Sequence, residues 1–484
     1  MSKQSLRGSV AWLFAGSIGN QVLTFATGVV LARLLMPADF GLLLTVQVFT
    51  GIAGLIATGG MGQALVRAER ITRSDTNVIF TIQFGVGLAF FLFLYSIAPF
   101  FADLYGAPIY GELLRISALT FIIRPFANTP GALLQREMRF KAKALIGMVV
   151  LLTSSTASIS MALLDLGVYS LVWGGICGAL MNATLSAYHA RWLPGINLQL
   201  SQARSLAQYG GMVTLNNLFF YARSQTTNFL ISLYQAPVFL GLFNKADSLR
   251  TLPNQMISGS IYQVSFRALS KVQDDLPEAR RLFLRALFLG WLYLFPIYTA
   301  LFFAASPFID FVYGKHWQAA GPALSLFALS GPLLLLSNQC GAVLEACNRL
   351  PQELRLQTEV WIIQLALLFA LLLYAPSINN LALGLTALAA YNTLRMLGLA
   401  MATLQLDWPT LRRTLAPVLA INAGLILLAA GFDLLLAGLK GPSPFFYLAA
   451  FLPLTGVAYA VLTLTSSTPE IKEEATRWLK RVRR

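Results

Sequence analysis

The 484-residue chain is 57% hydrophobic and only 11% charged, with a mean hydropathy of +0.67. Soluble domains carry about 25% charged residues, so this composition excludes an ordinary soluble protein and indicates a membrane protein built from long apolar segments. The net charge of +15 alone would suggest a nucleic-acid partner. The placement of the basic residues, described below, indicates membrane topology instead, and we expect no nucleic-acid partner.

Apolar stretches of helical length follow one another along the chain and exceed the ~10-residue alternating segments of an outer-membrane barrel. We predict an all-α polytopic membrane protein with about fourteen transmembrane helices. In chain order the predicted spans are 9–35, 41–66, 76–101, 111–135, 144–164, 167–189, 205–233, 238–265, 281–306, 319–346, 356–375, 378–405, 411–435 and 444–465.

The loops between these spans alternate in charge. One set contains basic stretches such as "QREMRFKAK" and "NRLPQELR", whereas the other contains only two basic residues, Lys315 and Lys440. Loops rich in Lys and Arg are cytoplasmic in bacterial membrane proteins. We therefore expect both termini in the cytoplasm. The basic tail at 468–484 is compatible with an amphipathic helix on anionic headgroups or with a simple solvated segment.

Three pairs of stretches repeat at offsets of about 200 to 210 residues along the sequence. "NTPGALLQREMRF" at 128–140 matches "NQCGAVLEACNRL" at 338–350, "APFFADLYG" at 98–106 matches "SPFIDFVYG" at 306–314, and "LMPADFGLL" at 35–43 matches "YQAPVFLGLF" at 234–243. The repeat unit is about six spans, so both copies enter the membrane in the same orientation. We predict two six-helix lobes at 1–200 and 201–405, extra helices within 406–467 and a cytoplasmic tail at 468–484.

Several basic residues fall inside predicted spans, where a charge costs about 2.5 kcal/mol or more. A cationic lumen favours an anionic passenger, and arginine binds phosphate with two parallel hydrogen bonds. The polar side chains around them suit a hydroxyl-rich ligand. The predicted substrate-binding residues are Arg33, Arg124, Arg223, Lys245, Arg250, Arg395, Asn217 and Gln225.

Each of these residues also has a purely structural interpretation. Arg33 lies near a span end and can reach the headgroups or pair with Asp39. Arg250 follows Asp247 by three residues, so the two can form a salt bridge on one helix face. The polar amides can serve as hydrogen-bonding contacts between helices. Arg223 has no acidic residue within ten positions on either side, which favours a functional role.

The sequence lacks the patterns of an enzyme or an ATP-driven pump. It contains no GxxxxGK[ST] motif, no paired carboxylates and no nucleophile elbow. Its three cysteines and two histidines have no metal-site spacing. We therefore predict a non-enzymatic transporter without a cofactor, for which coupling to a H⁺ or Na⁺ gradient stays open.

Several stretches resemble the Wzx-type oligosaccharide flippases, which form the polysaccharide transporter family. This family belongs to the MOP superfamily, which also contains the MATE exporters and the lipid II flippase. The resemblance rests on "LARLLMPADFGLL" (31–43), "APFFADLYGAP" (98–108), "NTPGALLQREMRFKAKA" (128–144), "RSQTTNFLISLYQAPVFLGLFNKADSLRTLP" (223–253) and "FPIYTALFFAASPFIDFVYGKHW" (295–317). Relatives often carry an Asp where this chain has Thr227. If that Asp serves ion coupling or charge balance in the relatives, this chain lacks the acid at that position and its coupling mode differs.

The resemblance implies a MATE-like fold in the bacterial inner membrane. It also implies that the chain flips a polyprenyl-diphosphate-linked oligosaccharide by alternating access, for lipopolysaccharide or exopolysaccharide synthesis. Expected partners are this lipid-linked substrate, membrane lipids, a polysaccharide polymerase and glycosyltransferases. Two alternatives are a MATE-like multidrug exporter coupled to H⁺ or Na⁺, which needs acids at membrane depth, and a membrane-embedded polymerase, which needs a large outer loop.

Overall fold

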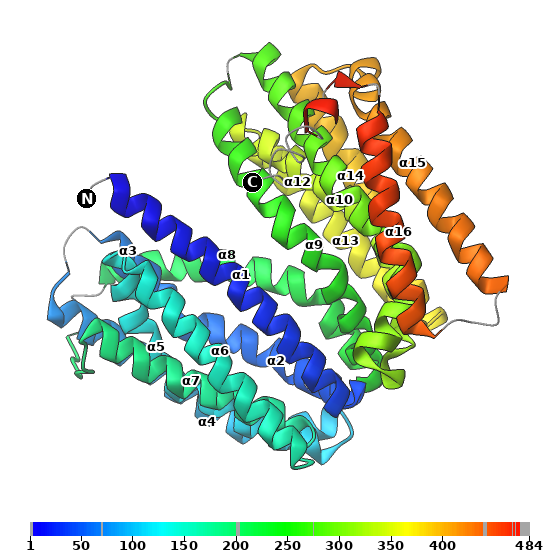
Figure 1. Cartoon of the computed structure of the whole chain (residues 1–484). Helices are drawn as coiled ribbons and strands as arrows, with labels where there is room; N and C mark the ends of the chain where they lie inside the picture. Colours follow the sequence, from blue (N-terminus) through cyan, green and yellow to red (C-terminus); the bar gives the residue numbers. More distant parts are fainter. Residues whose placement is uncertain are drawn as a thin grey trace. The chain divides into compact units, whose positions relative to one another are not determined.

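A computed structural model of the chain describes residues 3–68, 71–199, 204–273, 275–438, 443–466, 468–469 and 471–474. Within these residues the fold is all-α, as predicted (Figure 1). The helices are α1 (Lys3–Leu34), α2 (Pro37–Thr58), α3 (Met61–Arg67), α4 (Arg73–Leu104), α5 (Pro108–Arg136), α6 (Phe140–Leu163), α7 (Val168–Ala190), α8 (Arg204–Tyr234), α9 (Pro237–Leu269), α10 (Leu276–Tyr313), η2 (Lys315–Trp317), α11 (Ala320–Ala328), α12 (Gly331–Ala346), α13 (Leu350–Tyr374), α14 (Ile378–Leu404), α15 (Trp408–Gly438) and α16 (Pro444–Thr465).

Each predicted span corresponds to one long helix or to a broken pair of helices. The span predicted at 41–66 breaks between α2 and α3, where Gly59 and Gly60 adopt left-handed φ angles of 57° and 58°. The span predicted at 319–346 bends by 45° between α11 and α12. Pro332 in the first turn of α12 has no backbone N–H to continue the preceding helix.

Fewer helices are long and apolar enough to be identified as membrane spans than the structure contains in total. Among the described residues, eight helices meet both criteria, or nine if the bent pair α11–α12 counts as one span. α5, α8 and α9 are not among them. α5 contains Arg115 and Arg124, and α8 contains Arg223 among several amides, so polar residues lower the mean hydropathy of the very helices that carry candidate site residues.

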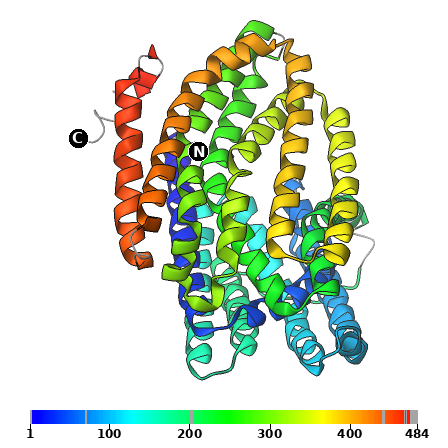
Figure 2. The ribbon, with the colours of Figure 1, turned by 90° about the vertical axis from the view of Figure 1, so that its right-hand side faces the viewer.

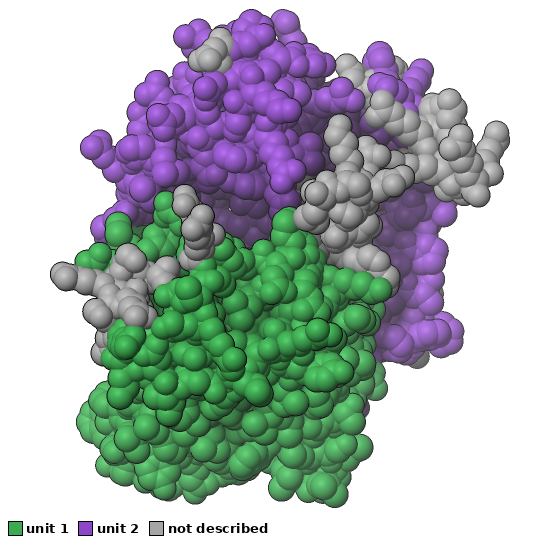
Figure 3. All heavy atoms as spheres, turned by 90° about the vertical axis from the view of Figure 1, so that its left-hand side faces the viewer, with its two compact units in different colours: residues 1–241 green, residues 242–484 purple. Residues whose placement is uncertain are grey.

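The chain forms two compact units, Met1–Gly241 (unit 1) and Leu242–Arg484 (unit 2), which Figure 3 distinguishes by colour. Unit 1 contains α8, which packs against α2 and α3. The lobes predicted at 1–200 and 201–405 follow the sequence repeat instead, and they stay a prediction. In unit 2, α15 and α16 lie side by side and both contact α10 (Figure 2).

The repeat is visible in the backbone of each unit. Met138 and Asn348 occupy equivalent positions after α5 and α12 and have positive φ angles of 54° and 58°. Gly106 and Gly314, which follow α4 and α10, have φ angles of 69° and 93°. In unit 1, α5 packs between α4 and α7, and in unit 2 the α11–α12 pair packs between α10 and α14. Both copies therefore share one internal packing order.

The core of unit 1 is an aromatic and aliphatic layer that α2, α4, α5 and α7 enclose, with Phe121 and Leu113 fully buried. Gly87 on α4 lets α5 approach closely, because a Cβ there would overlap the backbone carbonyl of Phe121. In unit 2, Phe283, Tyr298 and Leu335 belong to the core between α10 and α12. These layers fix the helices around the polar groups described next.

Candidate functional site

A cavity of about 550 Å³ lies inside unit 1. α2, α3, α4, α5, α6, α7 and α8 all contribute side chains to its wall. The lining residues are Leu55, Thr58, Gly60, Gly62, Gln63, Val66, Arg67, Gln83, Ala127, Asn128, Gly131, Ala132, Leu134, Gln135, Lys143, Ile146, Gly147, Val150, Asn182, Ser186 and Asn217. Its volume is in the range of small-molecule binding pockets, about 300–1,000 Å³.

Among the described residues that line the cavity, the charged ones are the cations Arg67 and Lys143, and none is an Asp or Glu. Arg67 is the last residue of α3, and its guanidinium carbon lies 4.6 Å from the centre of the Tyr209 ring on α8. Lys143 lies in the first turn of α6, and its Nζ donates a hydrogen bond of 2.9 Å to Oε1 of Gln135 on α5. Two cations in one described wall are the kind of groups that contact anionic ligands.

Carboxamides supply most of the remaining polarity. Gln83 is 1% exposed, and its Nε2 donates to the carbonyl oxygen of Thr58 at 3.0 Å. Thr58 is the last residue of α2, immediately before the Gly59–Gly60 break. Because the helix ends there, the carbonyl oxygen of Thr58 can accept the hydrogen bond from Gln83 on α4. The other carboxamides of the wall, which can donate to and accept from hydroxyl groups, are Gln63, Asn128, Gln135, Asn182 and Asn217.

Small and exposed residues keep the cavity open. A Cβ built on Gly131 would meet no atom within 4 Å, so this glycine borders empty space. Gln63 and Arg67 are exposed although they line the wall. The cavity is thus accessible from outside unit 1 at the end where α3 stops. Asn217 is the one predicted site residue among its lining residues.

Arg124 occupies a separate polar position between α2, α5 and α8. A Cβ on Gly54 would overlap its guanidinium, and a Cβ on Gly51 would overlap the hydroxyl of Tyr221. Tyr221 donates to the carbonyl oxygen of Gln47 on α2 at 3.0 Å, and its phenol interacts electrostatically with Arg124. Two glycines one helical turn apart on α2 therefore make room for an arginine and a tyrosine from neighbouring helices.

The other predicted residues of unit 1 lie along α8 and at the end of α1. Arg223 is half-buried two residues after Tyr221. Gln225 is half-buried, and its Oε1 accepts a hydrogen bond of 2.9 Å from Nδ2 of Asn228. Arg33 is exposed in the last turn of α1. None of these three residues lines the unit 1 cavity.

In unit 2, Arg250 has several partners. Its Nη2 forms a salt bridge with Asp247, as the i,i+3 spacing predicts, and its Nη1 donates to Oγ of Ser330 at 3.0 Å. The guanidinium carbon lies 4.6 Å from the centre of the Phe327 ring. These contacts join α9 to the α11–α12 break, so the guanidinium is already engaged within unit 2.

Lys245 and Arg395 also contact protein groups of unit 2. The Nζ of Lys245 lies 4.7 Å from the ring centre of Tyr313 and 4.9 Å from that of Trp317, which is a cation–π geometry. The Nη1 of Arg395 on α14 lies 2.7 Å from Oε1 of Glu359 on α13 and 2.7 Å from the hydroxyl oxygen of Tyr391. Glu359 supplies a protein counter-charge for Arg395.

Arg67 and Lys143 were missed as site residues from the sequence, because both lie in basic stretches that indicate a cytoplasmic loop. Their position in the cavity depends on the α2–α3 break and on the packing of α6, which local sequence does not encode. Among the described residues, no group of three or more His, Cys, Asp or Glu side chains is arranged to hold a metal ion. The arrangement is suited to binding an anion with hydroxyl-bearing groups.

The sequence profile of a family described as polysaccharide biosynthesis protein matches residues 30–322. The chain is 23% identical over 326 residues to the lipopolysaccharide biosynthesis protein WzxC of Escherichia coli K12, which covers 66% of this chain and 65% of that protein.

Two solved structures share the fold. The lipid II flippase MurJ in an inward closed conformation superposes with a TM-score of 0.74 at 14% identity, over 93% of this chain and 98% of that chain. An inward-facing multidrug resistance MATE transporter of the MOP superfamily gives a TM-score of 0.62 at 15% identity, over 82% of this chain and 96% of that chain. The predicted MATE-like fold class is thereby confirmed.

Proposed function

We propose that this chain, which belongs to the polysaccharide biosynthesis protein family, moves a polyprenyl-diphosphate-linked oligosaccharide across the bacterial inner membrane by alternating access. Membership of this family makes the chain a multi-pass membrane protein of polysaccharide biosynthesis, as its resemblance to the Wzx-type flippases predicted. The lipid-linked passenger, the direction of movement and the cytoplasmic location of both termini belong to the proposal.

The observation that carries the proposal is the cavity of unit 1, whose described lining holds two cations and no Asp or Glu. Arg67 and Lys143 supply two positive charges, and no carboxylate is among the lining residues that the structure describes. This suits a diphosphate because charge-assisted hydrogen bonds to phosphate are strong. The carboxamides around them offer donors and acceptors to sugar hydroxyls. A membrane-spanning carrier needs such a polar site, because charges and sugars cross hydrocarbon only at high cost.

The basic-loop pattern supports the orientation within this proposal. Arg67 and Lys143 belong to the predicted cytoplasmic loops "VRAERITR" and "QREMRFKAK", so the open end of the cavity would face the side on which lipid-linked oligosaccharides are assembled. Glycosyltransferases would supply the passenger there, and a polymerase would use it on the other side. The arginines at greater depth, Arg124 and Arg223, are then candidates for contacts during translocation.

A deletion strain of the source bacterium tests the proposal. We expect loss of the gene to abolish surface polysaccharide and to accumulate lipid-linked oligosaccharide on the cytoplasmic side, and the wild-type gene to restore both. We expect Lys143→Gln to lower restoration about tenfold, because a charge-assisted hydrogen bond contributes about 1.5–3 kcal/mol. Lys141→Gln is the matched control, because Lys141 is exposed and does not line the cavity.

Two outcomes would count against the proposal. Unchanged surface polysaccharide in the deletion strain would contradict the assigned pathway. A double deletion that also removes any second transporter of this kind checks that the result is not due to replacement by that transporter. Resistance to cationic dyes on expression, with no change in lipid-linked oligosaccharide, would favour the multidrug exporter instead. The cavity wall argues against that alternative, because the charged residues in its described part, Arg67 and Lys143, would repel a cationic drug.

A further inference from the structure

The short helix α3 supplies one side of the unit 1 cavity. It has seven residues, of which Gly62, Gln63, Val66 and Arg67 line the wall. A helix shorter than about 12 residues is marginal on its own, so tertiary contacts have to hold α3 in place. The last carbonyl groups of a helix also have no hydrogen-bond partner within it. The position of Arg67 in the cavity wall therefore depends on groups outside α3.

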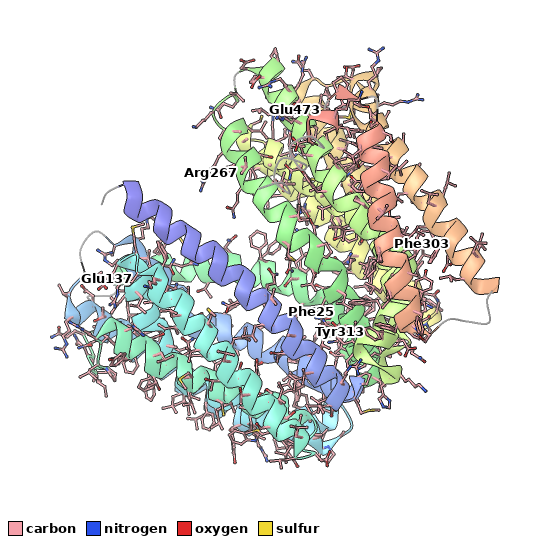
Figure 4. The ribbon with its side chains drawn as sticks, viewed as in Figure 1. Phe25, Glu137, Arg267, Phe303, Tyr313 and Glu473 are labelled. Carbon is pink, nitrogen blue, oxygen red and sulfur yellow. The ribbon has the colours of Figure 1, made fainter. Side chains whose placement is uncertain are left out.

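Arg136, the last residue of α5, binds the carbonyl end of α3. Its Nη1 donates to the carbonyl oxygens of Leu65 at 2.9 Å and Val66 at 3.4 Å, and also to that of Ala68, the C-cap residue. The helix dipole further favours a cation at a helix C-terminus. Glu137, which directly follows Arg136, marks this end of unit 1 in Figure 4. Arg136 is half-buried and is not among the residues that line the cavity.

Different groups hold the two sides of the last turn of α3. Leu65 is 0% exposed and belongs to a core cluster with Ile79 of α4. On the cavity side, the guanidinium of Arg67 lies over the ring of Tyr209 at 4.6 Å. Apolar packing is not directional, whereas the hydrogen bonds of Arg136 fix the carbonyl groups in space. These bonds therefore set the rotation of the last turn, and with it the direction of the Arg67 side chain.

The second copy of the repeat provides an internal comparison. In the matched stretches of the repeat, Ala346 on α12 takes the place of Arg136. The matched stretches at 35–43 and 234–243 open α2 and α9, so α9 corresponds to α2 and α3 together. α9 runs unbroken over Pro237–Leu269, and its last turn is the end of a 33-residue helix. The arginine is thus present in the copy whose last turn belongs to a short, separate helix, which has the greater need of an outside contact.

We propose that Arg136 is a positioning residue of the cavity, which fixes the last turn of α3 and thereby places Arg67 for contact with an anionic passenger. This role rests on the function proposed above, in which Arg67 binds the diphosphate. Arg136 itself does not contact the passenger, because its Nη1 is engaged by the carbonyl groups of α3. Loss of Arg136 therefore acts through Arg67, which a double-mutant cycle can measure.

Hydrogen–deuterium exchange of the full-length protein in detergent tests the contact with α3 without any transport. We expect the amides of 65–68 to exchange about tenfold faster in Arg136→Gln than in the wild type, because the charge-assisted contact to this turn is lost. Arg136→Lys should be intermediate, since lysine keeps the charge but lacks the planar fork. Arg73→Gln is the matched control, because Arg73 is an exposed cation of the same basic stretch and does not line the cavity.

Leaflet transfer in liposomes tests the link to Arg67. At a passenger concentration below half-saturation, we expect Arg136→Gln and Arg67→Gln each to lower the rate about tenfold. We expect the double variant Arg136→Gln/Arg67→Gln to stay within about twofold of Arg67→Gln, because the second substitution removes a contact whose target is already gone. Arg73→Gln should transfer at the wild-type rate.

Three results would overturn the proposal. They are unchanged exchange at 65–68 in Arg136→Gln, wild-type transfer by Arg136→Gln beside slow transfer by Arg67→Gln, and losses that multiply to about a hundredfold in the double variant. Wild-type transfer by Arg67→Gln would instead count against the proposed function of the cavity, and faster exchange at 65–68 would then still establish that Arg136 fixes α3. If Arg136→Gln does not fold, Arg136→Lys decides by the same two measurements.

Discussion

The ammonium of Lys143 on α6 donates a hydrogen bond of 2.9 Å to the side-chain oxygen of Gln135 on α5, inside the cavity of unit 1. No Asp or Glu is among the described residues of this wall, and the hydrogen bond fixes the lysine by a neutral partner rather than by a counter-charge. The positive charge is thus oriented but not neutralised, as expected for a group that binds an anionic ligand.

Replacing Gln135 tests that interpretation. Gln135→Glu would place a carboxylate beside Lys143 and neutralise the cavity from within, whereas Gln135→Ala would remove only the hydrogen bond. We expect Gln135→Glu to lower surface polysaccharide at least about tenfold more than Gln135→Ala, because close charge pairs at partly buried sites contribute about 1–3 kcal/mol. The measurement is complementation of a deletion strain at matched protein levels. Equal activity of the two variants would show that the cavity charge does not matter.

Gly54 and Arg124 form a second test, because a Cβ at Gly54 overlaps the guanidinium. We expect Gly54→Leu to displace Arg124 and to lower both the membrane level of the protein and its unfolding temperature. The double variant Gly54→Leu/Arg124→Ala should regain the protein level, since the overlap is gone, but not the transport. Gly85→Ala on α4 is the control, because its Cβ would meet no atom within 4 Å. Full transport by the double variant would exclude a binding role for Arg124.

Arg395 and Glu359 are expected to depend on each other. Arg395→Met leaves Glu359 without its cation, and Glu359→Leu leaves Arg395 without its anion, so each single variant should lower the unfolding temperature measured in detergent. We expect the double variant Arg395→Met/Glu359→Leu to recover most of the loss, because an ion pair replaced by apolar side chains is often tolerated. If the recovered double variant transports normally, Arg395 is structural and not one of the substrate-binding residues.

Asp407 provides a pH-dependent prediction at the start of α15. The Thr410 amide donates to its Oδ2 at 3.1 Å, and hydrogen bonds from Thr410 lower the pKa of Asp407 below its usual value. A lowered folded-state pKa stabilises the fold above the unfolded pKa of about 3.9, and this contribution is lost as the pH falls through the folded value. We therefore expect Asp407→Asn to match the wild type in thermal unfolding at low pH and to be less stable near pH 7.

Equal thermal stability of Asp407→Asn and wild type at every pH would contradict the assigned charge effect. Asp407→Ala separates the charge from the helix cap itself. This variant removes the cap at all pH values, so it should be less stable than the wild type both above and below the titration range, because Asp and Asn are both good N-caps and Ala is not.

Local features of the structure follow from the sequence to a large extent. Long apolar runs give the helices, and the repeat at 128–140 and 338–350 leads to matching left-handed residues at Met138 and Asn348. The Asp247–Arg250 salt bridge is predictable because three residues along a helix bring side chains onto one face. The breaks between α2 and α3 and between α11 and α12 were not predicted, since Gly and Pro occur in many membrane helices that continue unbroken.

Contacts between distant segments lie beyond such local rules. Arg395 meets Glu359 across two antiparallel helices, 36 residues apart in sequence, and nothing in either helix identifies the partner. In the sequence, Arg67 and Lys143 are basic residues of predicted loops. In the structure, the packing of α3 and α6 places both of them in the wall of one cavity. The cationic lumen stays a prediction, and which cations line a cavity depends on tertiary structure.

The most direct test of the central claim is leaflet transfer by the purified protein. The wild type, Lys143→Gln, Arg67→Gln and Lys141→Gln are reconstituted into liposomes with a fluorescent polyprenyl-diphosphate oligosaccharide, and the fraction protected from an external glycosidase is followed over time. We expect transfer by the wild type and Lys141→Gln, and rates about tenfold lower for each cavity variant. Wild-type rates in both cavity variants, or no transfer by the wild type with its native passenger, would contradict the account.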